Sequence, residues 1–441
     1  MSSTTLFGEV SADSGDVRVV PAGVQGEPRV QRAERFQMEW RPTHLDALLA
    51  PDHRARLIWA AVDRLDLGRF YASIQARGTS PGRPAIDPKI LVALWLYATS
   101  EGVGSARELD RLCEAHDAYR WICGGVTVNY HTLSDFRVGH AEALDELMTQ
   151  VLAVLMHTGL VRLERVAQDG MKVRASAGAA SFRREGGLKR CLAAAREQVE
   201  YVKQQADSPD PGRSARERAA AERAAREREE RVTRALAELP KVRAVKETPQ
   251  AKEEARVSTT DPQARVMKMA DGGYRPAYNV QLATDTQSRA IVGVSLTNAG
   301  NDMGQTDPML EEIERRGERK PEELLVDGGF VRLDSIQKAA EQGVRIYAPL
   351  QQPRSAEIDP HQPKRGDPPG VAAWRQRMGT EEGKAIYKER AATAETVNAD
   401  LRVWRGLDRM GVRGRAKVWC VVLWAAIAYN LLRWAAQGGL A

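Results

Sequence analysis

Cysteine and histidine are scarce in this chain of 441 residues, which has four cysteines and seven histidines. The cysteines lie far apart and form no Cys-x-x-Cys pair, which argues against a zinc finger and a disulfide framework and fits a reducing compartment. The histidines supply no His-Glu-x-x-His or His-x-x-x-His pair, so a histidine-bound zinc is not expected. The sequence therefore favours neither a secreted disulfide scaffold nor a zinc enzyme.

Long apolar runs are also missing. Residues 1–30 are polar and lack the apolar core of a secretory signal. The most apolar run, 418–429, is followed by Asn430 and soon by Arg433. A run of about a dozen residues is too short to span a bilayer and is typical of a buried helix. We therefore expect a soluble, cytoplasmic protein with no membrane partner.

The charge balance is mildly basic, with 65 Lys and Arg against 59 Asp and Glu, a formal net charge of +6 and a pI near 9.1. This excess permits a polyanionic partner without requiring one. The length allows two or three domains, each with its own core. A composition of 43% hydrophobic and 28% charged residues is that of a mainly globular protein.

The first part of the chain divides into a flexible tail at 1–37 and a helical domain at 38–158. A helix is expected to begin at Pro88, because apolar residues then recur at helical spacing. Ser105 is the expected cap of the next helix, with Glu108 at the capping-box position.

Gly124-Gly125 predicts a turn after these helices, and the polar segment 126–137 follows it. Short helices joined by glycine turns favour a helix-turn-helix-like unit that contacts DNA. The alternative is that the domain serves only as a scaffold.

Residues 186–258 depart from globular composition, because Ala, Glu and Arg dominate them. Pro209 and Pro211 divide the segment into two helical stretches. No apolar heptad runs through it, so a long coiled coil is not expected. We favour a pair of solvated helices held partly by Glu–Arg pairs at i,i+4 over a dedicated DNA-binding arm.

The rest of the chain, residues 159–436, alternates between strand and helix patterns and predicts a mixed α/β domain. Asp285-Thr-Gln-Ser marks a hairpin between two of the strands. Residues 351–375 are rich in proline and charge and predict a loop. The predicted strands are 162–168, 274–284, 290–297, 323–326 and 344–348, and the predicted helices are 307–316, 333–342, 381–404 and 415–434.

Two of the predicted strands end in an aspartate that is followed by glycine, at Asp169-Gly170 and Asp327-Gly328. A carboxylate at the end of a buried strand either caps a turn or binds a positive group. Turn capping is the stronger interpretation of each aspartate by itself. Two such residues in one domain, with an acidic helix downstream, favour a shared site.

The acidic helix is the one predicted at 381–404. At about 100° per residue, Tyr387, Glu395 and Arg402 fall within roughly 80° of one another, whereas Glu389 lies about 120° from Glu395. An ordinary surface helix with Glu–Arg pairs is the alternative interpretation.

These acids together resemble the DDE motif of insertion-sequence transposases. The string from Tyr387 through Arg390 and Glu395 to Arg402 is similar to the family's Tyr–Arg–Glu–Lys/Arg signature. Arg402 stands where the family often has lysine, which keeps the charge but changes the geometry. Gly82-Arg-Pro-Ala-Ile-Asp-Pro and Ser105-Ala-Arg-Glu-Leu resemble its InsH-like N-terminal domain, and Val412-Arg-Gly-Arg-Ala-Lys-Val resembles the segment before its last helix. The resemblance covers roughly residues 38–436.

The resemblance implies an RNase H-like mixed-sheet catalytic domain of the α/β class, preceded by an all-helical domain. The charged segment 186–258 would be an insertion, whose role cannot be copied from a minimal member. The first aspartate would lie on the central strand, the second at the end of a neighbouring strand, and the glutamate on a helix beside them.

The activity implied is metal-dependent cleavage of transposon ends and strand transfer into target DNA. Asp169 would bridge two Mg²⁺ or Mn²⁺ ions, while Asp327 and Glu395 would each complete one coordination shell. The partners implied are the terminal inverted repeats and target DNA in the nucleoid, bound by a homodimer or a larger assembly. The alternatives are a catalytically inactive, transposase-derived DNA-binding protein and an RNase H-like nuclease that does not join strands.

Basic and polar residues around the acids and in the helical domain are expected to contact DNA. Trp121 is expected to belong to the core instead. The candidates for DNA contact are Tyr387, Arg390, Arg402, Lys172, Arg174, Arg413, Arg415, Lys417, Asn129, Tyr130 and Arg137.

Overall fold

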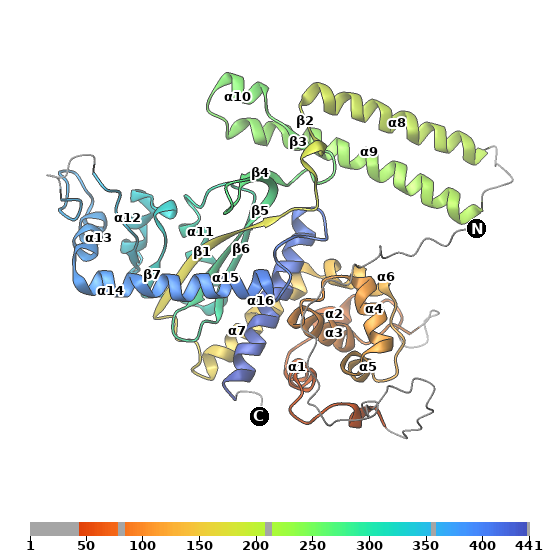
Figure 1. The fold of residues 1–441 in the computed structure, drawn as a ribbon, viewed down its shortest axis with the longest axis horizontal. Helices are drawn as coiled ribbons and strands as arrows, with labels where there is room; N and C mark the ends of the chain where they lie inside the picture. Colours follow the sequence, from red (N-terminus) through yellow and green to blue (C-terminus); the bar gives the residue numbers. More distant parts are fainter. Residues whose placement is uncertain (1–43, 78–83, 208–213, 354–358, 439–441) are drawn as a thin grey trace, which may run out of the picture. The chain divides into compact units, whose positions relative to one another are not determined.

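The fold is that of a computed structural model, which describes residues 44–77, 84–207, 214–353 and 359–438 (Figure 1). The expected tail at 1–37 lies outside these residues. His44–Ala441 forms one compact unit.

Short helices make up the first part of the described chain. The helices predicted at Pro88 and after Ser105 are both confirmed, and the Ser105 hydroxyl accepts a hydrogen bond from the Glu108 amide at 3.4 Å. Gly124 ends the next helix with a φ of 58°, a conformation that glycine adopts without strain. The helices are α1 (Arg54–Asp63), α2 (Gly68–Ala72), α3 (Pro88–Ser100), α4 (Ala106–Ala115), α5 (Asp117–Cys123), α6 (Tyr130–Gly139) and α7 (Ala141–His157), after a 3₁₀ turn at Leu45–Leu48.

A mixed sheet forms the centre of the second part, in the order β4-β5-β1-β7-β8. β5 pairs with β1 along one edge, and with β4 and then β6 along the other. β1, β7 and β8 run parallel, whereas β5 is antiparallel to its neighbours. The strands are β1 (Arg165–Arg174), β4 (Arg265–Lys268), β5 (Tyr274–Asp285), β6 (Ile291–Thr297), β7 (Glu323–Leu325) and β8 (Arg345–Tyr347), with a separate pair β2 (Phe182–Arg183) and β3 (Val257–Ser258).

The position of the first aspartate within β1 differs from the prediction. The strand was expected to end at Asp169-Gly170, but it continues to Arg174. The physical reason is the neighbouring strand, because β5 pairs with β1 without interruption from Val166 to Arg174. A local turn signal is therefore overridden by a full ladder of backbone hydrogen bonds.

Helices flank the sheet and complete the domain. The expected loop at 351–375 is too long, because a helix begins at Pro369, where proline suits the first helical position. The helix predicted at 381–404 is interrupted by a π-helical turn at Ala391–Glu395. The elements are α11 (Thr306–Gly317), the 3₁₀ turn η3 (Gly328–Phe330), α12 (Leu333–Glu341), α13 (Pro369–Gly379), α14 (Glu381–Arg390), the π turn η4 (Ala391–Glu395), α15 (Thr396–Val403) and α16 (Arg415–Ala436).

The charged segment forms a helical hairpin of α8 (Glu185–Asp207) and α9 (Ala215–Ala244), followed by the short α10 (Pro249–Glu253) (Figure 1). Pro209 and Pro211 lie outside the described residues. The hairpin is mostly charged, as predicted, but it also buries a small apolar cluster of its own. This cluster comprises Leu188, Ala235, Leu239, Val242, Ala255 and Val257.

Helix α16 is the predicted apolar helix. By length and composition alone it could cross a membrane, but 78% of its most apolar window is buried inside the protein. It packs on α3, α7 and β6. This burial agrees with the expectation of a core helix.

Asn430 fastens α16 to the sheet. Its side chain is fully buried; Nδ2 donates to the Ile291 carbonyl and Oδ1 accepts from the Ile291 amide, both at 2.8 Å. Backbone groups at the outer edge of a strand need such partners when they are buried.

We expect Asn430→Ala to lower the free energy of unfolding by about 3 kcal/mol, because two buried backbone groups lose their partners. Chemical denaturation would measure it. Asn298→Ala is the control, since the half-buried Asn298 side chain makes one longer bond, to the Gln263 carbonyl at 3.2 Å. Equal losses in the two variants would contradict the assigned role.

Candidate active site

Asp169 is held between the sheet and a helix. Its Oδ1 accepts a hydrogen bond from Arg390 Nη2 at 2.9 Å, and its Oδ2 accepts one from Asn398 Nδ2 at 2.8 Å. Both partners lie on the nearly continuous rod of α14, η4 and α15, residues 381–403, which we call the helical rail (Figure 1). Two contacts therefore fix the rail against the middle of β1.

The surroundings of Asp169 disfavour a lone negative charge. Burial raises the pKa of its carboxyl above the usual range, and repulsion from Asp327 and Asp302 adds to this, while the Arg390 guanidinium opposes it. A nearby cation therefore stabilises the ionised form of Asp169.

Asp327 follows β7, and its carboxylate both caps a turn and faces a positive group. Its Oδ1 accepts a hydrogen bond from the Gly329 amide and so caps the η3 turn. Its Oδ2 lies 3.8 Å from Arg390 Nη2. Turn capping and cation contact are thus compatible at this position.

Arg390 joins the two aspartates. Its Nη2 lies 2.9 Å from Asp169 and 3.8 Å from Asp327, and its side chain is 12% exposed. The sequence suggested a phosphate contact for Arg390, but here its guanidinium faces the carboxylates. One cationic group therefore already lies between the two strand acids.

Glu395 lies at the end of the π turn and is exposed. Its side chain makes no hydrogen bond or ion pair with the described part of the chain. The i→i+5 repeat of the π turn places Arg390 and Glu395 one turn apart, and Asn398 is one α-helical turn further on. Glu395 is thus between the two rail residues that contact Asp169.

Two other acids of the rail have partners elsewhere. Glu389 pairs with Arg165 at the start of β1, at 2.6 Å. Asp400 pairs with Arg405 at 2.9 Å. Both carboxylates are engaged by arginines, whereas that of Glu395 is not, so Glu395 is the better candidate for a third acid.

Sequence reasoning missed the polar residues on the other face of the sheet. Asp302 Oδ1 accepts hydrogen bonds from Asn279 at 2.7 Å and from Gln281 at 2.6 Å. A Cβ atom at Gly170 would overlap Asp302 Oδ1 and lie 2.6 Å from Gln281 Nε2. A side chain at position 170 would therefore displace the Asp302 and Gln281 side chains, so the space beside Gly170 serves a close approach and not a turn. The Asn279-x-Gln281 alternation was the available signal.

The other residues predicted to contact phosphates near the acids lie in different surroundings. Tyr387 is close to the acids, and burial raises the pKa of its hydroxyl above the usual value. Arg174 instead pairs with Asp408 at 3.6 Å. Lys172 lies opposite Asn279, two residues after Gly170 and on the same face. Arg402 is partly exposed and forms no ion pair with the described residues.

The candidates in the helical domain have structural contacts. The Asn129 side chain caps α6 by accepting from the Thr132 amide at 3.0 Å. Tyr130 lies under Arg107, whose guanidinium carbon is 5.3 Å from the ring centroid. The Arg137 guanidinium stacks on Trp95 and donates to the Gly104 carbonyl.

Trp121 and the C-terminal candidates complete the set. Trp121 is half-buried, packs edge-on against Trp59 and donates to Asp46 at 3.1 Å. Arg413, Arg415 and Lys417 are exposed around the start of α16.

Two family models match the chain. One, described as a transposase DDE domain, matches residues 241–431, and the other, described as Transposase domain (DUF772), matches residues 43–139. The chain belongs to the DDE transposases. No curated protein matches it significantly. The match to the DDE domain includes Asp327 and Glu395 and begins after Asp169, so the first acid rests on the fold and its contacts.

Family and fold agree for this transposase. The α/β class, the N-terminal helical region and the RNase H-like domain expected from the sequence are confirmed. In the sheet, β1 is central, with antiparallel β5 on one side and parallel β7 on the other. Asp169 lies on this central strand and Asp327 just beyond the end of β7.

DDE transposases generally use divalent metal ions, and the carboxylates of Asp169 and Asp327 have the chemistry to bind one. Asp169 and Asp327 flank one cationic nitrogen, and carboxylate oxygens are the ligands that Mg²⁺ prefers. Within the residues described, however, no three acid, histidine or cysteine side chains gather closely enough to hold an ion. Arg390 lies between the first two acids, and Glu395 makes no contact with either.

Proposed function

We propose that this transposase cleaves the ends of its element and joins them to target DNA, with Asp169, Asp327 and Glu395 as the catalytic acids. The observation that carries the proposal is the single cationic group held between Asp169 and Asp327 at the centre of the sheet. A metal ion can replace that cation with a higher charge. The exposed Glu395, one turn from Arg390, supplies the third carboxylate.

The chemistry requires two phosphoryl transfers. In cleavage, a water oxygen attacks phosphorus, the bond to the 3′ oxygen breaks, and that oxygen leaves as a hydroxyl after gaining a proton. In joining, the same 3′-hydroxyl loses its proton and attacks a target phosphodiester, from which the target's own 3′ oxygen leaves. Two bound Mg²⁺ or Mn²⁺ ions would lower the pKa of the attacking group and stabilise the leaving oxygen.

The chain's own residues position the substrate in this scheme. Asp169 is fixed by Asn398, so its carboxylate keeps its orientation when Arg390 turns away. The Arg390 guanidinium then becomes available for a phosphate, which restores the DNA contact proposed from the sequence. Tyr387 and Arg402, on the same rail, are further candidates for phosphate contact.

The proposed partners are the terminal inverted repeats and target DNA, in the nucleoid of the cytoplasm. Pairing of two ends implies a homodimer or a larger assembly on DNA. Arg174 is a weaker candidate for DNA contact than the sequence suggested, because Asp408 neutralises it. Lys172 faces away from Asp169, so its contact would lie outside the acid site.

The proposal is tested by incubating the purified full chain with duplex DNA that carries the element's end. We expect nicked and joined products with Mg²⁺ or Mn²⁺, none with excess EDTA, and recovery when the metal is restored. DNA binding without cleavage would support the inactive alternative. Cleavage without any joined product would support a simple nuclease.

A further inference from the structure

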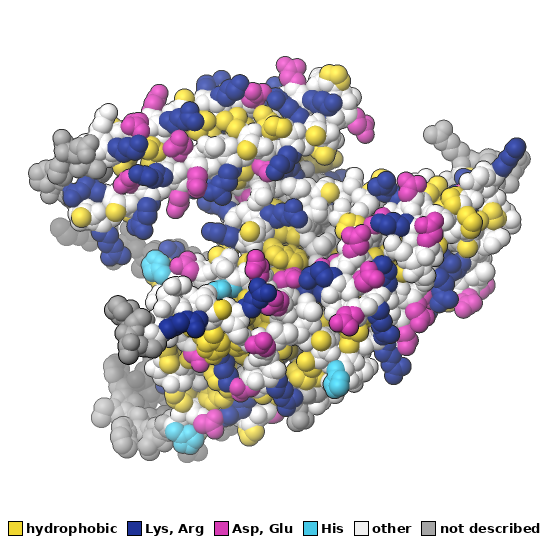
Figure 2. Space-filling model, turned by 180° about the vertical axis from the view of Figure 1, so that it is seen from behind, with side chains coloured by type: hydrophobic (Ala, Val, Ile, Leu, Met, Phe, Trp, Pro, Cys, Tyr) yellow, Lys and Arg dark blue, Asp and Glu magenta, His cyan; other side chains and the backbone are white. Residues whose placement is uncertain are grey.

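A cleft of about 1060 Å³ lies away from the acids. Its walls come from α9 of the charged hairpin, from α4 and α6 of the N-terminal helices, and from the turn that leads into α16. Figure 2 shows the surface hollowed beneath the hairpin, with Lys and Arg side chains spread over the hairpin itself. Three segments far apart in the sequence thus enclose one space.

Helix α9 has two distinct faces. Glu227, Glu230, Arg231, Arg234 and Glu238 line the cleft, and their spacing of three and four residues places them on one face. The buried residues Ala225, Val232, Ala235, Leu239 and Val242 belong to the other. The apolar face accounts for packing in the hairpin, but nothing in the fold requires the charged face to border a cleft.

The carboxylates of that face are already neutralised. Glu227 pairs with Arg231 at 3.6 Å and Glu230 with Arg234 at 2.7 Å. Glu238 pairs with both Lys241 and Arg265. The hairpin wall therefore contributes little net negative charge.

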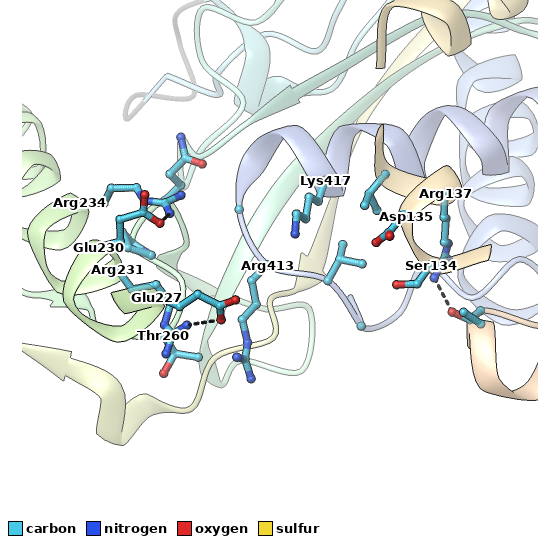
Figure 3. Close-up of a pocket in the computed structure, with 18 of the residues that line it drawn as sticks. Ser134, Asp135, Arg137, Glu227, Glu230, Arg231, Arg234, Thr260, Arg413 and Lys417 are labelled. Atoms are coloured by element: carbon cyan, nitrogen blue, oxygen red, sulfur yellow. Dashed lines mark hydrogen bonds and ion pairs between the residues drawn. The ribbon is translucent and has the colours of Figure 1, made fainter. Parts of the chain in front are cut away.

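The opposite wall has an excess of positive charge. Lys417 is exposed and has no ion pair among the residues described, and Arg413 reaches only the Ser176 carbonyl, at 3.3 Å. Arg107 lies over the Tyr130 ring and forms no ion pair with the described residues. Asp135 is the one lining acid with no cationic partner in the described chain. In Figure 3, Arg413 and Lys417 lie between the labelled residues of α9 and those of α6.

We propose that this cleft holds the sugar–phosphate backbone of duplex DNA, with α9 as one wall and α6 with the start of α16 as the other. Cations without carboxylate partners, interspersed with hydroxyl donors such as Ser134 and Thr260, suit phosphates better than an apolar or acidic ligand. The cleft exceeds what a single small anion needs. The charged hairpin is thus part of the DNA-binding surface and not only a solvated appendage.

The inference rests on the proposed function only in taking DNA as the partner. It is tested by binding and not by cleavage, in EDTA and with a labelled duplex of arbitrary sequence, so it can fail or succeed independently of the catalytic proposal. If the protein binds DNA through this cleft but does not cut it, the catalytic proposal fails and the cleft proposal stands.

The first test is the double substitution Arg413→Ala with Lys417→Ala. Each phosphate contact contributes about 0.9 to the slope of log K against log salt, so the slope should fall by nearly two. The dissociation constant should rise at least about tenfold at low salt. An unchanged slope and affinity would overturn the proposal, because these are the least neutralised cations of the cleft.

The second test compares two arginines of α9. Arg234 lines the cleft and pairs with Glu230 at i,i+4, whereas Arg226 does not line it and pairs with Glu222 in the same way, with similar exposure of 65% and 62%. We expect Arg234→Ala to lower the salt slope by about one and Arg226→Ala to leave it unchanged. If the two substitutions change the salt slope equally, or if Arg234→Ala does not change it, α9 is not part of the DNA-binding surface. Circular dichroism would check that the hairpin stays folded.

Discussion

Replacing Asp169 with Asn will slow metal-dependent cleavage about 1000-fold while DNA binding and folding are retained. The substitution keeps the size of the side chain but removes the charge that both the Arg390 guanidinium and a metal ion need. A loss of about 4 kcal/mol of transition-state stabilisation corresponds to this factor. The rate would be measured on a duplex that carries the element's end, under single-turnover conditions in Mg²⁺.

The choice of the third acid provides the matched control. Glu395→Gln should cause a comparable loss, whereas Glu389→Gln should change the rate by less than about tenfold, since Glu389 pairs with Arg165. The two residues differ by six positions on one rail. Cleavage that survives Glu395→Gln and is lost in Glu389→Gln would reverse the assignment, and unimpaired cleavage by Asp169→Asn would remove β1 from the active site.

Replacing Arg316 with Met will lower the free energy of unfolding by about 3–5 kcal/mol. The Arg316 side chain is 0% exposed and pairs with Glu312 of its own helix at 2.5 Å. It joins α11 to α7 through the Thr149 hydroxyl at 2.9 Å and both the carboxylate and the carbonyl of Asp145. Breaking a buried ion pair by removing one partner leaves the other groups uncompensated. Denaturant titration of the full chain would measure the loss.

Arg315 is the natural control, because it adjoins Arg316 and pairs with the same Asp145 at 2.8 Å. Its side chain is 49% exposed, so water already screens the pair. We expect Arg315→Met to cost less than about 1 kcal/mol. A similar cost for the two variants would show that burial of the Arg316 pair does not matter.

Local pattern was sufficient for most of the elements near the site. The hairpin of β5 and β6, the helix α11 and the strand before Asp327 all follow from periodicity and turn residues. The sequence pattern assigns Asp169 to the correct strand but to its end, because Asp-Gly is a turn signal, whereas the strand continues to Arg174. The space beside Gly170 is taken up by Asp302, which lies 132 positions further along the chain and leaves no local trace.

The π turn is the second feature that periodicity could not reveal. A wheel at 100° per residue aligned Tyr387, Glu395 and Arg402, but the wider turn shifts the phase of everything after Ala391. It makes Asn398 the residue that reaches Asp169. The charge of Arg390 also gave no indication of whether it would face a phosphate or a carboxylate.

The contacts between Asp169 and the rail also determine when the site can form during synthesis. Asn398 follows Asp169 by 229 residues. At about 5–20 residues per second, a ribosome adds these in roughly 10 to 50 s. The N-terminal helices precede this interval, the charged hairpin is added early in it, and the rail is added only at its end. A polypeptide released before residue 381 would therefore contain the N-terminal helices and the charged hairpin, but it would lack both the assembled acid site and the cations at the start of α16 that border the cleft.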